Sequence, residues 1–170
     1  DVTIEANAIV TDGHSLVGNV TQDMNPELGT IEVCAQRLGS ETYGIILYGG
    51  ESTGMFCIYD SSHYAFFNKC TASIVFEQSK FDIDSPFTVS LFGNSGVLNG
   101  SDSTGNITES WSQFPHFDII GGRQSNGQAG NYAAIARLYS IRMYNRILTK
   151  DEILYNQRLD NSRFNLGLII

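Results

Sequence analysis

Apolar and polar residues alternate along much of this chain with a period of two, which is typical of β-strands that bury one face. In segment 30–36, Ile31, Val33 and Ala35 share one face, and the residues between them, most of them polar, share the other. Short apolar segments then recur roughly every ten residues, separated by Gly, Asp, Ser and Pro. They are segments 44–48, 55–59, 64–68, 73–76 and 87–92. This rhythm predicts a β-sandwich or jelly roll rather than repeated β-α-β units.

A hairpin and a long loop are predicted in the middle of the chain. Residues 93–96, Gly-Asn-Ser-Gly, tolerate positive φ and separate the apolar segments 88–92 and 97–98, which we therefore expect to pair. Segment 99–113 is polar and long, which predicts a surface loop. That loop contains Trp111, the only tryptophan of the chain.

Segment 135–148 has the pattern of a strand with one buried face. The residues on the predicted buried face are Ile135, Tyr139, Ile141 and Met143. Ser140 and Arg142 have the other parity and are expected on the opposite face. Tyr144 interrupts the alternation, which indicates that this opposite face is also partly covered.

A helix is predicted to begin directly after this strand. Thr149 and Glu152 have the spacing of a capping box, in which the threonine hydroxyl accepts from the Glu152 amide and the glutamate accepts from the Thr149 amide. Leu148 and Ile153 occupy the two positions of a hydrophobic staple. The helical spacing continues to Leu159, so one face of the helix is expected to dock and the other to stay in water.

The same C-terminal segment resembles the end of laminin-G-like domains of the concanavalin A-like lectin/glucanase superfamily. There the closing strand reads roughly (I/V)-x-x-(V/I)-R-(I/V/M)-Y-N-R-x-L, and a short helix with Glu-Ile follows. The matching residues are Leu138, Ile141, Arg142, Met143, Tyr144, Asn145, Arg146, Leu148, Glu152 and Ile153. Weaker matches occur in segments 29–33, 87–100 and 119–123. The resemblance implies an all-β, two-sheet antiparallel jelly-roll sandwich with one short C-terminal helix.

Length and composition agree with a single domain over residues 1–170, which we expect to be part of a longer protein. Only 16% of residues are charged, and 17 Gly stand against 3 Pro, which favours strands and tight turns. The predicted core consists of Ile31, Val33, Ile45, Leu47, Phe76, Val89, Leu91, Ile119, Ile141 and Met143.

Charge and hydropathy exclude two classes of partner. The formal net charge is -8 and no compact Lys/Arg cluster is present, so nucleic-acid binding is not expected. No segment approaches the roughly 18 consecutive apolar residues of a spanning helix, so membrane insertion is not expected either. Cys34, Cys57 and Cys70 are an odd number and lack C-x-x-C spacing, which favours buried free thiols over a disulfide framework or zinc site.

Glycoside hydrolysis is the catalytic activity that the resemblance raises. The related glucanases carry an E-x-D-x-E type strand that places two carboxylates on either side of the sugar. The nearest segment here is Phe81-Asp82-Ile83-Asp84, which has no glutamate and precedes Ser-Pro, a turn sequence. We therefore expect Asp82 and Asp84 to be solvated turn residues and the chain not to be an enzyme.

No cofactor is expected from the residues themselves. Calcium is possible, because many laminin-G-like domains and lectins hold this ion at the rim of the sandwich. Asp60, Asp102 and Asp118 fall in or beside predicted loops. Calcium needs six to eight oxygen ligands, however, and no local D-x-D-x-D sequence supplies them.

Sugar binding depends on an exposed aromatic ring beside planar polar side chains. Trp111 is the main candidate, with Asn106, Glu109 and His116 as neighbours in sequence. Tyr59 and His63 form a second polar-aromatic group at a predicted strand edge. Each group also has a structural alternative that stays open. In the first, Trp111 packs on Phe114 and Phe117 and binds no ligand; in the second, Tyr59 is an ordinary half-buried strand residue.

Three functions follow from these observations. The first is a non-catalytic recognition module for a glycan or cell-surface polysaccharide, within a larger surface-exposed, secreted or phage-borne protein. The second is a structural or adhesive domain of a phage virion, phage tail or cell-surface protein that binds protein or no ligand. The third, a glucanase-like hydrolase, is disfavoured by the missing carboxylate pair. Extracellular, cell-surface or virion localisation is expected for the first two.

Overall fold

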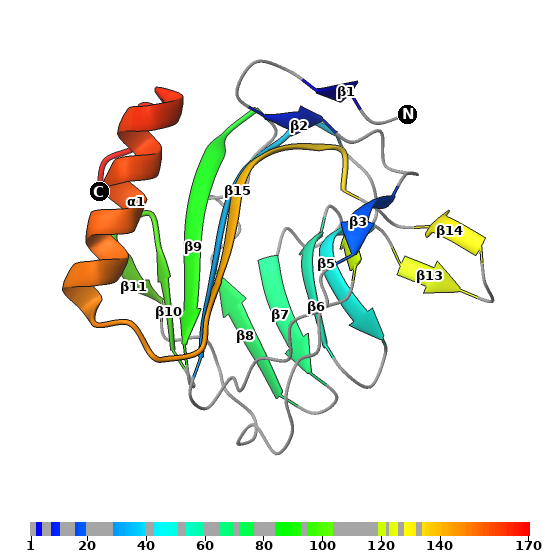
Figure 1. Cartoon of the computed structure of the whole chain (residues 1–170), viewed down its shortest axis with the longest axis horizontal. Helices are drawn as coiled ribbons and strands as arrows, with labels where there is room; N and C mark the ends of the chain where they lie inside the picture. Colours follow the sequence, from blue (N-terminus) through cyan, green and yellow to red (C-terminus); the bar gives the residue numbers. More distant parts are fainter. Residues whose placement is uncertain are drawn as a thin grey trace.

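Two antiparallel β-sheets packed face to face form the body of the protein (Figure 1). The computed structural model describes residues 3–4, 8–10, 16–19, 29–39, 43–50, 54–59, 65–69, 72–76, 84–92, 95–103, 119–121, 123–125, 128–131 and 134–170. Helix α1 (Lys150–Phe164) lies on the outer side of one sheet. The all-β, two-sheet jelly-roll sandwich with one short C-terminal helix is therefore confirmed.

The sheet under the helix has seven strands in the order β1-β2-β15-β4-β9-β10-β11. These strands are β1 (Thr3–Ile4), β2 (Ile9–Val10), β15 (Ala136–Tyr144), β4 (Thr30–Arg37), β9 (Pro86–Phe92), β10 (Ser95–Leu98) and β11 (Ser101–Ser103). All neighbouring pairs are antiparallel. The pairing of β9 with β10 is the predicted hairpin.

The second sheet has six strands in the order β3-β12-β5-β6-β7-β8. They are β3 (Leu16–Asn19), β12 (Ile119–Gly121), β5 (Tyr43–Gly50), β6 (Gly54–Tyr59), β7 (Ala65–Lys69) and β8 (Ala72–Phe76). A separate hairpin joins β13 (Arg123–Ser125) to β14 (Gln128–Asn131). The predicted strands from segments 44–48 to 87–92 correspond to β5, β6, β7, β8 and β9, with ends that differ by one or two residues.

The core fills the space between the two sheets. Its buried residues are Ile31, Val33, Ala35, Ile46, Leu47, Phe87, Val89, Leu91, Leu98, Ala134, Ala136 and Leu138. Five predicted members are thereby confirmed: Ile31, Val33, Leu47, Val89 and Leu91. Ile141 and Met143 are partly buried and pack against this cluster. The side chains of Ile45, Phe76 and Ile119 lie outside the described part of the structure.

A β-bulge in β15 corrects one prediction. Leu138 pairs with Ala35 and Ser140 with Cys34, so Tyr139 is an extra residue between two consecutive pairs. The bulge lets Leu138 and Ile141 both face the core, although strict alternation would place them on opposite faces. Tyr139 instead lies on the helix side, where its hydroxyl donates to Gln36 Oε1 at 2.9 Å. The prediction that Ile135 and Tyr139 share the core face with Ile141 and Met143 was wrong, because the buried core residues before the bulge are Ala134, Ala136 and Leu138.

Helix α1 begins as predicted and ends later than predicted. The Thr149 hydroxyl accepts from the Glu152 amide, and the Glu152 carboxylate accepts from the Thr149 amide, so the capping box is present. Leu148 and Ile153 are buried together beside Val97, which confirms the staple. The helix continues past Leu159 to Phe164, because its buried face carries polar residues that apolar periodicity does not detect.

Candidate functional site

The outer face of the seven-stranded sheet carries polar residues that the helix covers. Glu32 on β4 and Ser90 on β9 lie under α1, and the Ser90 hydroxyl donates to Glu32 Oε1 at 3.0 Å. From the helix, Gln157 donates to Ser90 Oγ at 3.0 Å and to the Val97 carbonyl at 3.1 Å. Its amide oxygen accepts from the Gly100 amide at 2.9 Å. Helix and sheet are thus joined by directed hydrogen bonds.

An ion pair holds the next turn of the helix to β15. Arg142 donates to Asp160 through both terminal nitrogens, one of them at 2.7 Å from Oδ2. Ser140 donates to the same oxygen at 2.8 Å, and the Arg142 guanidinium lies 3.7 Å from Glu32. Burial raises the pKa of Glu32, and the hydrogen bond from Ser90, the positive charge of Arg142 and other neighbours counteract this only in part.

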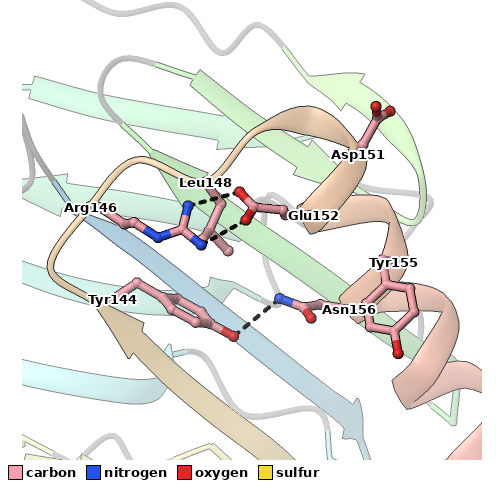
Figure 2. Close-up of a pocket in the computed structure, with 7 residues that line it drawn as sticks. All are labelled: Tyr144, Arg146, Leu148, Asp151, Glu152, Tyr155 and Asn156. Carbon is pink, nitrogen blue, oxygen red and sulfur yellow. Dashed lines mark hydrogen bonds and ion pairs between the residues drawn. The ribbon is translucent and has the colours of Figure 1, made fainter.

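A cavity of about 400 Å³ opens beside this network, where β15 ends and α1 begins. Its lining residues are Tyr144, Arg146, Leu148, Asp151, Glu152, Tyr155 and Asn156. Figure 2 shows the Tyr144 hydroxyl pointing toward Asn156 and the Tyr155 ring on the helix beyond it. The volume falls in the lower range of small-ligand sites.

The floor of the cavity is held in place by the buried network. Asn156 Nδ2 donates to Tyr144 Oη at 3.1 Å and to Glu32 Oε2 at 2.9 Å. Both bonds use the amide nitrogen, so the Asn156 amide oxygen is the group left to meet a ligand. Burial raises the pKa of the Tyr144 phenol, which therefore stays neutral and able to share its hydroxyl.

The rim of the cavity is charged and open to solvent. Arg146 donates to both oxygens of Glu152, at 2.7 and 2.8 Å, and these bonds, with those from Thr149, lower the pKa of Glu152 to about 2. Asp151 is exposed, and Tyr155 is 65% exposed. An exposed ring beside a fixed amide and carboxylates can stack on a flat ligand and accept hydrogen bonds from it.

The two arginines of the C-terminal motif are both paired with acidic side chains. Arg142 and Arg146 each bridge a neighbouring carboxylate. Tyr155 and Asn156 were missed by the sequence analysis. A signal existed for Tyr155, since a large aromatic ring on the water-facing side of an amphipathic helix is unusual.

The sequence-predicted binding residues lie outside the described part of the structure. These residues are Trp111, Asn106, Glu109, His116 and His63. For Tyr59 the backbone is described, in β6, where it pairs with Tyr43, but its side chain is not. Their role as ligand-binding residues stays a prediction.

The predicted acids and cysteines give no catalytic or metal site in the described residues. Asp84 is exposed in a turn with φ 64°, as expected for a turn residue, while Asp82 is not described. No group of three His, Cys, Asp or Glu side chains in the described ranges is arranged to hold a metal ion. Cys34 is a buried free thiol, and burial raises its pKa. Within the same ranges, no helix has the length and apolar character needed to span a bilayer.

Comparison with known proteins identifies the fold. No family model matches the sequence, and no curated protein sequence is significantly similar to it. Among solved structures, the CBM40 of the Ruminococcus gnavus IT-sialidase, bound to α2,3-sialyllactose, is 13% identical with a TM-score of 0.63, over 92% of this chain and 100% of that chain. The native heptameric SAP-like pentraxin from Limulus polyphemus is 11% identical with a TM-score of 0.59, over 89% and 82%.

A third structure is the ligand-binding domain of botulinum neurotoxin serotype D in complex with N-acetylneuraminic acid. It is 11% identical with a TM-score of 0.66, over 93% of this chain and 44% of that chain. At these identities the likeness concerns the fold. The chain has the two-sheet jelly-roll sandwich fold of these structures, and its membership of the concanavalin A-like superfamily, and of the laminin-G-like group within it, is a proposal.

Proposed function

We propose that this chain is a non-catalytic carbohydrate-recognition module of a larger extracellular, cell-surface or virion protein. The observation that carries the proposal is the cavity at the start of α1, where the exposed Tyr155 ring lies beside Asn156 and Asp151. The fold supports it, because two solved structures with this fold hold sialyllactose and N-acetylneuraminic acid.

The cavity has the chemistry that sugars require. A pyranose presents a flat C–H face, which stacks on an aromatic ring and gains on the order of 1 kcal/mol beyond area burial. Its hydroxyls need acceptors that are already oriented, and Asn156 is oriented by Tyr144 and Glu32 before any ligand arrives. The conformational entropy of the Asn156 side chain is therefore already lost on folding, and ligand binding does not have to reduce it further.

A second location is proposed from the sequence alone. Trp111, with Asn106, Glu109 or His116 as hydrogen-bond partners, would bind sugar at a loop rim, and Tyr59 with His63 would do so at a strand edge. Calcium at such a rim belongs to the same proposal. The two locations are distinguished by separate variants.

The test is a glycan array with the purified chain, run with and without calcium, followed by calorimetric titration of the best glycan. Tyr155→Ala is expected to weaken binding at least fivefold, and Tyr155→Phe, which keeps the ring, is the matched control. Trp111→Ala tests the loop. Absence of binding to every glycan would contradict the proposed function.

Absence of hydrolysis is part of the proposal. We expect no release of reducing sugar from β-glucans, because the acid pair of the related glucanases has no counterpart in the sequence. Turnover that disappears in Asp82→Ala or Asp84→Ala would overturn this statement.

Protein binding is the competing function. Tyr155 and Leu159 are both exposed and lie one turn apart on α1, which is the spacing of a helix face that contacts another protein. An adhesive or structural domain of a virion or surface protein would use such a face. An empty glycan array with a folded chain would favour this function.

A further inference from the structure

The charges around the cavity are unbalanced. Among its lining residues Arg146 is the one cation, while Asp151 and Glu152 are both carboxylates. Lys150, next to Asp151 in sequence, is not part of the lining. A ligand in the cavity therefore meets more negative than positive charge.

This cation, the Arg146 guanidinium, is already paired with Glu152. Arg146 gives both terminal nitrogens to Glu152 in a bidentate pair, at 2.7 and 2.8 Å, and its backbone carbonyl accepts from the Thr30 hydroxyl at 3.0 Å. Glu152 already neutralises the charge of this guanidinium, so a ligand carboxylate would have to compete with Glu152 for it.

The layer beneath the cavity has the same imbalance. Glu32 and Asp160, each about 4% exposed at the side chain, share one guanidinium, that of Arg142. Because Asn156 connects Glu32 directly to the cavity floor, the buried carboxylate lies close below the ligand space. The formal net charge of the whole chain, these residues included, is also negative, at -8.

From this arrangement we infer that the cavity takes a neutral saccharide and discriminates against its sialylated counterpart. The inference rests on the proposed function and specifies its ligand class. A sialic acid carboxylate would lie among like charges with no uncommitted cation in the lining, whereas a neutral pyranose can stack on Tyr155 and donate hydroxyls to Asp151 and Asn156.

The experiment pairs each neutral glycan on an array with its sialylated form, lactose and α2,3-sialyllactose among them. We expect the neutral member of the best-bound pair to bind at least tenfold more tightly, and Tyr155→Ala to weaken this binding at least fivefold. The preference should shrink as NaCl rises from about 0.05 to about 0.5 M, because salt screens repulsion between exposed charges.

Asp151→Asn is the specificity variant. It removes one lining carboxylate without changing shape and is expected to reduce the neutral-over-sialylated preference about three- to tenfold. Asp84→Asn is the matched control, since it changes net charge equally. Asp84 lies beside Arg37, whereas the cavity adjoins Thr30 at the opposite end of β4. The control should leave the preference unchanged.

The outcomes separate this inference from the proposed function. Tighter binding of the sialylated member, lost in Tyr155→Ala, would overturn the charge argument and keep the carbohydrate module. Binding lost in Trp111→Ala but unaffected by Tyr155→Ala would place the site elsewhere and overturn the inference alone. Failure of every glycan to bind would overturn both.

Discussion

Arg142 forms ion pairs with Glu32 and Asp160, and these pairs join helix α1 to the seven-stranded sheet. Two carboxylates that are almost fully buried are tolerated because the guanidinium lies between them and each also accepts hydrogen bonds. Such a group costs desolvation free energy and stabilises the fold only when all partners are present. Removing a single member therefore has a large and unequal effect.

Arg142→Met is expected to destabilise the fold by about 3 kcal/mol, the lower end of the range for breaking a buried pair, because the arginine is 24% exposed. It would leave Glu32 and Asp160 buried without a cation. Asp160→Asn should cost about half as much, since Arg142 keeps Glu32 at 3.7 Å. Urea unfolding of the two variants checks the order; equal losses would contradict it.

The raised pKa of Glu32 predicts a pH effect on stability. Burial raises it above the ordinary 4.5, so the folded protein binds this proton more tightly than the unfolded chain. The ionised carboxylate thus costs stability at neutral pH, and that cost is relieved as pH falls through the folded pKa.

Comparison with Glu32→Gln isolates this contribution. The free energy of unfolding of the wild-type chain, minus that of the variant, should increase between about pH 7 and about pH 5. Carboxyl groups that lie far from position 32 titrate equally in both proteins and cancel. A difference that stays constant or decreases would show that Glu32 does not titrate in this way.

Among the elements, helix α1 is held by hydrogen bonds at both of its ends. Its start carries the capping box, and after the helix the chain turns back, where Asn161 exchanges hydrogen bonds with the amide and carbonyl of Leu168. The tail then reaches the turn between β10 and β11. A Cβ atom built at Gly100 would lie 2.9 Å from Ile170 Cα, so the close approach requires glycine.

Gly100→Ala and Gly167→Ala form a matched pair. Both positions have positive φ, 77° and 70°, so each substitution should cost about 1 kcal/mol of backbone strain. Only Gly100 has an atom in the way, and we expect its substitution to cost about 1 kcal/mol more. Urea midpoints measure both, and equal shifts would show that the tail does not pack on the turn.

Seen against the whole sandwich, the cavity is small and lies at the junction of β15 and α1. The cavity offers one exposed ring and few polar groups, so a single module should bind a monovalent glycan weakly. A parent protein that presents several copies would bind through avidity.

Tetramers of the chain, assembled on streptavidin, should bind a glycan-coated surface about 100-fold more tightly than the monomer. Interferometry at several glycan densities measures this, with tetrameric Tyr155→Ala as the control. Equal apparent affinities for monomer and tetramer would indicate a ligand that is bound by one module alone.

The strand rhythm, the hairpin, the capping box and the excess of negative charge could all be predicted from the amino-acid order. Each of these is a local or summed property: alternation records one buried face, and Thr149 and Glu152 are close in sequence.

Which carboxylates Arg142 and Arg146 bridge, and which side chains lie beside them, depends on how distant segments of the chain pack together. Glu32 reaches Asn156 across 124 positions of sequence, a separation about which periodicity carries no information. The bulge that moves Tyr139 to the helix side depends on the register between β15 and β4. The cavity lies where the end of β15 meets the first turns of α1. The packing of α1 on the sheet brings these two elements together.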